Sequence, residues 1–182
     1  MELTGSLGDV MKESARAAIS YIRSLSPALG IEPDFYKTND IHIHVPEGAV
    51  PKDGPSAGVT MVTALVSELC GIPVRRDVAM TGEITLHGRV MAIGGLREKT
   101  MAAYLAGVRT ILIPKDNESD IAEIADEVKA AVEIKTISSA KEALTLALER
   151  DPFERVRTSI AGRAVFKTEN KTLVVTRFDK FK

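Results

Sequence analysis

Short runs of β-forming residues alternate with amphipathic stretches along most of this chain. This alternation constrains the fold strongly, because strands that are separated by helices usually pair in parallel. The strand patterns lie at residues 41–45, 110–114 and 132–137, with two or three further short strands within 77–93. The helical patterns lie at residues 6–26, 57–70, 96–106, 118–126 and 140–148. We therefore predict an α/β fold with a mixed, partly parallel sheet and an added hairpin region.

Proline and glycine mark several of the predicted boundaries. The first helix is expected to end before Pro27, and Gly71 is expected to stop the second helix. We interpret residues 1–150 as one domain. Residues 151–182 differ in composition, with a basic excess and two strand patterns around Glu169–Asn170 that suggest a hairpin. We interpret them as a C-terminal extension of unknown role.

The composition argues against several classes of protein. The 182 residues carry 24 basic and 25 acidic side chains, a net charge of −1, so the surface as a whole shows no preference for nucleic acid or for an anionic membrane. The single cysteine, Cys70, excludes an intrachain disulfide, and no apolar run is long enough to span a membrane. We expect a cytoplasmic protein that binds neither nucleic acid nor membrane through this domain.

The segment Gly54-Pro55-Ser56-Ala57-Gly58 fits the G-x-S-x-G pattern of hydrolases that present a reactive serine on a strand-to-helix turn. A Ser-His-Asp triad of the α/β-hydrolase kind fits poorly, because the one histidine after Ser56 is His87, which follows it too closely. Serine is also a common N-cap residue of helices. The pentapeptide alone is therefore compatible with either a nucleophile or a helix cap at Ser56.

A proton acceptor for this serine is suggested by the predicted helix 96–106, where Lys99 shares a face with Leu96, Ala102 and Ala103. The simplest interpretation is that the lysine stem lies along the protein and its ammonium group reaches water. An ordinary lysine, with a pKa of about 10.4, is a poor base at neutral pH, but burial among apolar neighbours lowers such a pKa. A neutral lysine can take the proton of a serine, as in Ser-Lys hydrolases. Lys99 is therefore a candidate general base.

Two phosphate-binding interpretations compete with catalysis. Gly94 and Lys99–Thr100 partly match a phosphate loop, but Glu98 stands where that motif requires glycine, and a carboxylate there would repel a phosphate. We therefore expect that this chain does not hydrolyse ATP. The segment Lys52–Val59 is a glycine-containing loop that enters a helix, so a phosphate- or nucleotide-binding module without peptidase activity is the alternative function.

Five motifs occur in order between residues 3 and 103, within a resemblance that runs from about Leu3 to Leu148: LTGSLGDVMKESA, IHIHVPEGA, PKDGPSAG, TGEITLHGRV and GGLREKTMAA. Together they resemble the proteolytic domain of the bacterial ATP-dependent Lon protease family. The resemblance implies a fold similar to the second domain of ribosomal protein S5. It also implies that Ser56 is the nucleophile and Lys99 the general base of a Ser-Lys dyad, in a serine endopeptidase that cleaves unfolded or damaged proteins.

The same resemblance implies roles for four further residues. Thr81 matches a position that hydrogen-bonds the lysine and helps to orient it, and Asp53 matches a position able to modulate access to the dyad. His42 and His44 match histidines beside the active site. Two histidines on one face of a strand could contribute to a metal site, but without a third ligand at suitable spacing we expect structural hydrogen bonding and no metal.

The resemblance also implies partners. Members of the family assemble as homo-hexameric rings in which an AAA+ ATPase module unfolds the substrates. ATP and Mg belong to that module, so we expect no cofactor in a domain like this one. The expected partners are unfolded polypeptide substrates and the ATPase module of the full-length chain.

Overall fold

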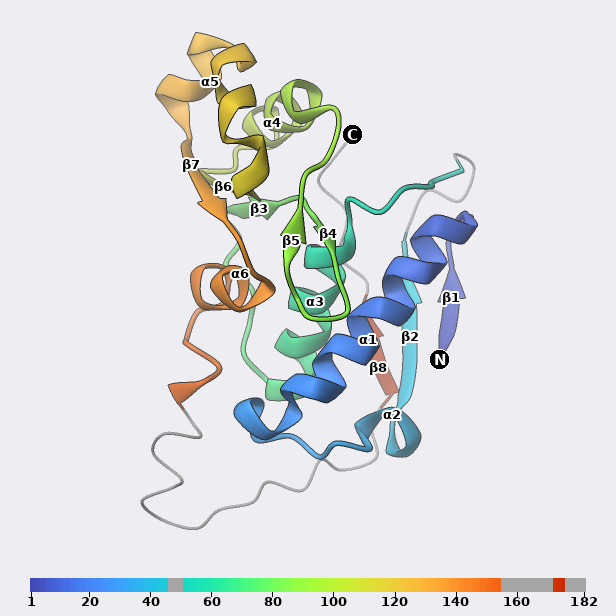
Figure 1. Cartoon of the computed structure of the whole chain (residues 1–182). Helices are drawn as coiled ribbons and strands as arrows, with labels where there is room; N and C mark the ends of the chain where they lie inside the picture. The colour runs from blue at the N-terminus through green and yellow to red at the C-terminus, as the bar shows by residue number, and fades with distance from the viewer. Residues whose placement is uncertain (46–50, 155–171, 176–182) are drawn as a thin grey trace.

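The computed structural model describes residues 1–45, 51–154 and 172–175, whose arrangement is shown in Figure 1. In chain order the elements are β1 (Glu2–Thr4), α1 (Asp9–Leu29), α2 (Phe35–Thr38), β2 (Asp40–His44), α3 (Gly58–Cys70), β3 (Val78–Met80), β4 (Glu83–Ile84), β5 (Val90–Met91), α4 (Leu96–Leu105), β6 (Thr110–Pro114), the 3₁₀ helix η1 (Lys115–Glu123), α5 (Asp126–Ala131), β7 (Glu133–Ile137), α6 (Ala140–Ala147) and β8 (Thr172–Val175). Helices and strands alternate along most of the chain, so the predicted α/β class is confirmed.

The strands of the described residues form three small sheets. Two are parallel, with strand orders β1-β2-β8 and β3-β6-β7, and the third is the antiparallel pair β4-β5. In that pair Glu83 lies opposite Met91 and Ile84 lies opposite Val90, as a hairpin requires. The sequence indicated parallel strands and a hairpin correctly. It suggested one mixed sheet because an alternating pattern predicts parallel pairing without saying which strands are neighbours.

Buried side chains gather in two clusters, which we call the first core and the second core. The first core lies among α1, α3, α6 and one face of β2, and Ile22, Ile43 and Leu65 are among its fully buried members. The second core lies beneath α4 and α5 and includes Leu96 and Val128. Figure 1 shows α4 and α5 at one end of the molecule, above the region where α3 crosses α1. The two candidate dyad residues therefore lie on different cores, because α3 belongs to the first and α4 to the second.

Strand β6 separates the two cores. All five of its residues are buried. Because side chains alternate across a strand, Leu112 packs in the first core, whereas Ile111 and Ile113 pack in the second. The pairing of β6 with β3 and β7 thus sets how the two cores meet.

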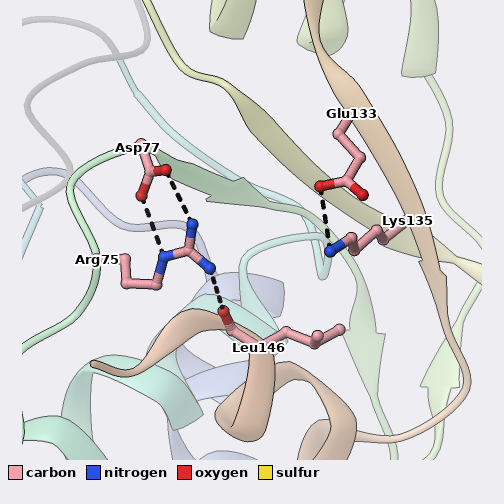
Figure 2. Close-up of polar contacts among 5 residues, drawn as sticks. All are labelled: Arg75, Asp77, Glu133, Lys135 and Leu146. Atoms are coloured by element: carbon pink, nitrogen blue, oxygen red, sulfur yellow. Dashed lines mark hydrogen bonds and ion pairs between the residues drawn. The ribbon is translucent and has the colours of Figure 1, made fainter. Parts of the chain in front are cut away.

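A polar clamp joins the segment that leads into β3 to the end of α6 (Figure 2). The Arg75 guanidinium donates to both carboxylate oxygens of Asp77, at 3.2 and 2.9 Å, and to the Leu146 carbonyl at 3.4 Å. These hydrogen bonds hold the pKa of Asp77 below its ordinary value. The Arg75 backbone N–H also donates to the Ala147 carbonyl at 2.8 Å. The clamp therefore fixes the path of the chain from α3, on the first core, to β3.

The first helix runs past its predicted end. α1 continues through Pro27 to Leu29 and stops at Gly30, where φ is +67°. Pro27 lies on the exposed side of the helix, whereas Leu29 is only 3% exposed and packs in the first core. Burial of Leu29 outweighs the one hydrogen bond that proline cannot donate, so glycine rather than proline ends the helix.

The helix predicted at residues 118–126 is confirmed only in part. The chain forms η1 there, and Ile124 then adopts an extended conformation before α5 begins. Ile124 is 2% exposed and packs in the second core. The extended Ile124 divides the predicted helix into two segments, η1 and α5, which both pack on the second core.

Two short elements, β1 and α2, were not predicted, because segments of three or four residues carry too little periodicity. β8 lies in the part interpreted as a C-terminal extension, and it pairs in parallel with β2. The rest of the hairpin predicted around Glu169–Asn170 lies outside the described residues. None of the helices in the described ranges is long and apolar enough to cross a membrane.

Candidate active site

The loop that carries Ser56, which we call the serine arm (residues 51–58), is tied to the start of α1. The Lys52 N–H donates to the Ser6 carbonyl at 3.0 Å, and the Lys52 carbonyl accepts from the Gly8 N–H at 2.8 Å. Together these bonds form a parallel bridge between Lys52 and Leu7. The serine arm is therefore anchored through its backbone, four residues before the serine.

Asp53 adds a side-chain anchor at the same place. Its Oδ1 accepts from the Met11 N–H, in the first turn of α1, at 3.0 Å, and from the Gly54 N–H at 2.9 Å. A carboxylate here satisfies an unpaired helix N–H and is favoured by the positive end of the helix dipole. The fit is tight, because a Cβ on Gly8 would lie 2.2 Å from Cγ of Asp53. Asp53, which we expected to modulate access to the dyad, thus lies at the root of the serine arm and caps α1.

Ser56 lies just before α3, as the sequence predicted. The N-cap of α3 is Ala57 and no side chain caps this helix, so the capping interpretation of Ser56 is wrong. The Ser56 carbonyl accepts two hydrogen bonds, from the Gly82 N–H at 2.8 Å and from Thr81 Oγ1 at 3.3 Å. The Ser56 hydroxyl makes no hydrogen bond with any residue that the structure describes. The backbone holds this serine in place and, within residues 1–45, 51–154 and 172–175, leaves Oγ without a hydrogen-bond partner.

The two glycines of the G-x-S-x-G pattern have different physical reasons. Gly54 has φ +127°, a conformation that only glycine adopts readily. Gly58 has an ordinary φ, but a Cβ there would lie 3.0 Å from the backbone nitrogen of Ile84. The first glycine permits the turn of the serine arm, and the second lets the start of α3 approach β4.

The start of α3 also leaves donors close to the Ser56 hydroxyl. Among the described residues, the backbone N–H groups of Ser56 and Ala57 donate to no acceptor. They lie at the positive end of α3, where partial positive charge accumulates. This environment favours a negatively charged oxygen.

Lys99 lies one turn into α4, and we call residues 93–99 the lysine arm. The Lys99 backbone N–H donates to the Gly95 carbonyl at 3.1 Å, and its Nζ donates to the Gly94 carbonyl at 2.9 Å. Gly95 is the N-cap of α4, with φ +70°, and a Cβ on it would lie 3.4 Å from Nζ. Both ends of Lys99 are thus bonded to the glycine pair that precedes the helix.

The predicted apolar face of α4 is confirmed at Leu96 and Ala103, which are buried in the second core. Ala102 and Lys99 on the same face are partly exposed. The chain therefore does not bury the amine among apolar side chains, and Nζ lies against a backbone carbonyl instead. The simpler interpretation, a lysine stem lying along the protein with an accessible amine, describes this arrangement.

Within the described residues no hydrogen bond joins Ser56 to Lys99. The buried Thr81 hydroxyl donates to the Ser56 carbonyl, whereas the resemblance implied a bond to Lys99. The Thr81 backbone N–H donates to the Leu112 carbonyl on β6 at 3.1 Å. In this arrangement Thr81 therefore connects the serine arm to the strand that both cores share.

His42 and His44 lie on the partly exposed face of β2, opposite its core-facing isoleucines. Thr4 Oγ1, on the neighbouring strand β1, lies 2.8 Å from His42 Nε2 and 2.7 Å from His44 Nδ1. This is the hydrogen bonding that we expected for the pair. No cluster of three or more His, Cys, Asp or Glu side chains suited to a metal occurs in the part of the chain that the structure describes.

Sequence reasoning missed one residue that contacts the lysine arm. Asn117, in η1, is 3% exposed and bonds through its side-chain amide to both backbone groups of Ile93. The one local feature that could have drawn attention to Asn117 is its place in the acidic segment KDNESD, directly after the buried strand β6. We predicted a helix from Glu118 onward and gave this asparagine no role.

Comparison with known proteins identifies the family. Residues 1–150 match the Lon protease (S16) C-terminal proteolytic domain. The Lon protease of Brevibacillus choshinensis is 60% identical over 152 residues, which cover 84% of this chain and 20% of that protein. For the Lon protease of Escherichia coli K12 the identity is 58% over 149 residues, covering 82% and 19%, and for that of Azospirillum brasilense it is 60% over 168 residues, covering 91% and 21%.

The matches to these relatives and to the family agree on the same region. Residues 1–150 include the serine arm, the lysine arm and both cores. The chain spans about a fifth of the length of these relatives. The chain belongs to the family of Lon protease C-terminal proteolytic domains.

Proposed function

We propose that this chain is the peptidase domain of an ATP-dependent serine endopeptidase, which cleaves unfolded or damaged proteins through a Ser56–Lys99 dyad. The observation that carries the proposal is the placement of Ser56. Its carbonyl is fixed by Gly82 and Thr81, while its hydroxyl and the backbone N–H groups of Ser56 and Ala57 make no hydrogen bond with any described residue. Membership of the Lon proteolytic-domain family supports peptidase activity.

In the proposed reaction, Ser56 Oγ attacks the carbonyl carbon of a peptide bond while the neutral amine of Lys99 takes the hydroxyl proton. The resulting oxyanion is stabilised by the N–H groups at the positive end of α3. Lys99 then returns the proton to the leaving amine, and an acyl group remains on Ser56. A water molecule then gives a proton to Lys99 and attacks the carbonyl carbon of the acyl group. When the bond from that carbon to Ser56 Oγ breaks, Lys99 passes the proton to Oγ, and both residues return to their starting state.

To form the dyad, the lone pair of neutral Lys99 Nζ must reach the Ser56 hydroxyl, while one of its N–H groups keeps the hydrogen bond to the Gly94 carbonyl. The serine arm is anchored by backbone bonds at Lys52 and at Ser56 itself, whereas Nζ is held by a single hydrogen bond. We infer that the lysine side chain makes the larger movement when the dyad forms.

The proposal extends to the surroundings of the domain. We propose a fold like the second domain of ribosomal protein S5, a homo-hexameric ring in the cytoplasm, and an AAA+ ATPase module in the full-length chain. That module binds ATP and Mg and delivers unfolded polypeptide, so this domain needs no cofactor of its own. Family membership and the length of the relatives, about five times the matched segment, support this arrangement.

The experiment that tests the proposal compares Ser56→Ala and Lys99→Arg with the unaltered chain, using a fluorescently labelled unstructured polypeptide. We expect both variants to lose at least about a thousandfold in cleavage rate, since a guanidinium cannot give up its proton. Lys12→Arg, at an exposed lysine paired with Asp9, is the matched control and should cleave normally. Cleavage retained by Lys99→Arg would exclude Lys99 as the base.

A titration with ATP separates this function from nucleotide binding. We expect no binding to this chain. Tight binding that is lost in Ser56→Ala but kept in Lys99→Arg would replace the peptidase proposal with the phosphate-binding alternative.

A further inference from the structure

The side-chain amide of Asn117 is buried and uses all of its hydrogen-bonding groups in one place. Oδ1 accepts from the Ile93 N–H at 2.9 Å, and Nδ2 donates to the Ile93 carbonyl at 2.9 Å and to Asp120 Oδ2 at 2.7 Å. The residue is 3% exposed. Asn117 therefore pairs with the backbone of Ile93 at two points, much as a neighbouring strand would.

The chemistry of this contact requires an amide. Ile93 presents a donor and an acceptor side by side, and an amide offers the complementary acceptor and donor on one planar group. Aspartate in its place would put a second acceptor against the Ile93 carbonyl, and an apolar residue would leave both backbone groups without a partner. Asp120 fixes which way the amide is turned. Its carboxylate can accept a hydrogen bond from Nδ2 but has no hydrogen to donate to Oδ1.

Ile93 leads directly into the two glycines that hold Lys99. The carbonyl of the next residue, Gly94, accepts from Nζ at 2.9 Å, and the carbonyl of Gly95 accepts from the Lys99 backbone N–H at 3.1 Å. Asn117 thus holds Ile93, the first residue of the lysine arm. Lys99, the last residue of the arm, is bonded to the two glycines that lie between. A shift of Ile93 would move both acceptors of Lys99.

We propose that Asn117 is a positioning residue for the catalytic lysine. By holding the backbone of Ile93 against η1, it sets where Lys99 Nζ lies relative to Ser56. This inference rests on the proposed peptidase function. Asn117 touches neither reacting group and acts through the backbone of the lysine arm. A displacement of about 1 Å in such a group costs up to about a hundredfold in rate, so loosening this anchor should slow the chemical step more than it weakens substrate binding.

The primary test is Asn117→Asp, an isosteric change that removes the donor facing Ile93. We expect kcat for cleavage of an unstructured polypeptide to fall about 10- to 100-fold while KM stays within about twofold, because misplacement of the base affects the transition state. The matched control is Asn39→Asp. Asn39 is also buried and donates through Nδ2 to a backbone carbonyl, that of Phe35, at 2.8 Å, but it lies beside α2, at the opposite end of the molecule from α4 (Figure 1).

A second readout does not depend on cleavage. The NMR signal of the Lys99 side-chain carbon next to Nζ, assigned by its loss in Lys99→Arg, is recorded in each variant. We expect Asn117→Asp to shift the position of this signal, and Asn39→Asp to leave it unchanged. If Asn117→Asp does not fold, Asp120→Asn weakens the same anchor from a partly exposed position, with an expected kcat loss of about 3- to 10-fold.

The outcomes separate this inference from the proposed function. An unchanged Lys99 signal in Asn117→Asp, or a loss of kcat no larger than in Asn39→Asp, would overturn the positioning role. Undiminished cleavage by Ser56→Ala would overturn the proposed function instead, and in that case the position of the Lys99 NMR signal still decides whether Asn117 positions the lysine.

Discussion

The serine arm and the lysine arm are anchored by different kinds of group. The serine arm is held mainly by its backbone, through Lys52 beside α1 and through the Ser56 carbonyl at Gly82. The lysine arm is held by two side chains, those of Asn117 and of Lys99 itself. Backbone bonds survive most substitutions of the residues that make them, whereas a side-chain anchor disappears with one mutation. The lysine arm is therefore the more vulnerable of the two.

The two arms also rest on different cores. α3, which follows Ser56, packs in the first core, and α4, which carries Lys99, packs in the second. The separation of the two candidate catalytic groups is consequently set by the way the cores meet at β6. A substitution on the face of β6 that packs in the first core should disturb the serine arm first, and one on the opposite face should disturb the lysine arm first.

The largest effects are expected from truncating β6 on either face. Leu112→Ala and Ile113→Ala each remove a fully buried side chain and should lower the free energy of unfolding by about 2–5 kcal/mol. Hydrogen exchange should distinguish them, with protection lost first in α3 for Leu112→Ala and first in α4 and α5 for Ile113→Ala. Equal loss throughout the molecule in both variants would show that the two cores behave as one unit.

A smaller effect is expected from a pair of glycine substitutions, one next to the serine arm and one within the lysine arm. Gly8→Ala places a Cβ 2.2 Å from Asp53 and should displace the cap of α1, lowering the free energy of unfolding by about 1–3 kcal/mol. Gly94→Ala meets no atom within 4 Å and should change it by less than about 0.5 kcal/mol. Urea unfolding measures both. A cost at Gly94 as large as that at Gly8 would contradict this account of the two anchors.

Thr81 offers a finer test of the serine arm. Thr81→Val keeps the shape of this buried side chain but removes the donor to the Ser56 carbonyl, and should cost about 1 kcal/mol. Thr81→Ser keeps the hydroxyl and should retain the bond. In Thr81→Val the Gly82 N–H still donates to the Ser56 carbonyl, so we expect the serine arm to stay in place. The cleavage rate of this variant should therefore fall only a few-fold. Complete loss of cleavage in Thr81→Val would instead indicate direct participation in the dyad.

The smallest effect concerns pH and the Arg75 clamp between the segment before β3 and the end of α6. Arg75 holds the pKa of Asp77 below its ordinary value of 3.8, so the stabilisation is fully present above that value and is lost as the pH falls through the lower, folded-state pKa. The urea midpoint should therefore decline slightly more steeply below pH 3.8 in the unaltered chain than in Asp77→Asn. Parallel curves for the two proteins would show that the clamp contributes nothing to acid stability.

Much of the fold could be predicted because its signals are local. The apolar spacing before Gly71 placed α3, and the same kind of spacing placed α4 and β6 within a residue or two. The exceptions follow from contacts that local patterns do not contain. Leu29, for example, extends α1 beyond Pro27 because the first core buries it.

The candidate site divides in the same way. The position of Ser56 before a helix and of Lys99 on the apolar face of another followed from residues close to each in sequence. The anchors did not, because Asp53 bonds to a residue 42 positions away and Asn117 to one 24 positions away. Spacing along the chain predicts which face a side chain occupies, but not which distant backbone group it will meet.

The bridge from Thr4 to His42 and His44 has one more consequence. A threonine hydroxyl carries a single hydrogen, so it can donate to one imidazole only, and when both rings are neutral the other ring must donate its own N–H to the threonine oxygen. The tautomers of the two histidines are therefore interdependent: moving the hydrogen on one ring obliges the hydroxyl to rotate and the second ring to rearrange. Three side chains on two strands thus share one hydrogen-bond relay, and the outer face of β2 changes its pattern of donors and acceptors as a unit.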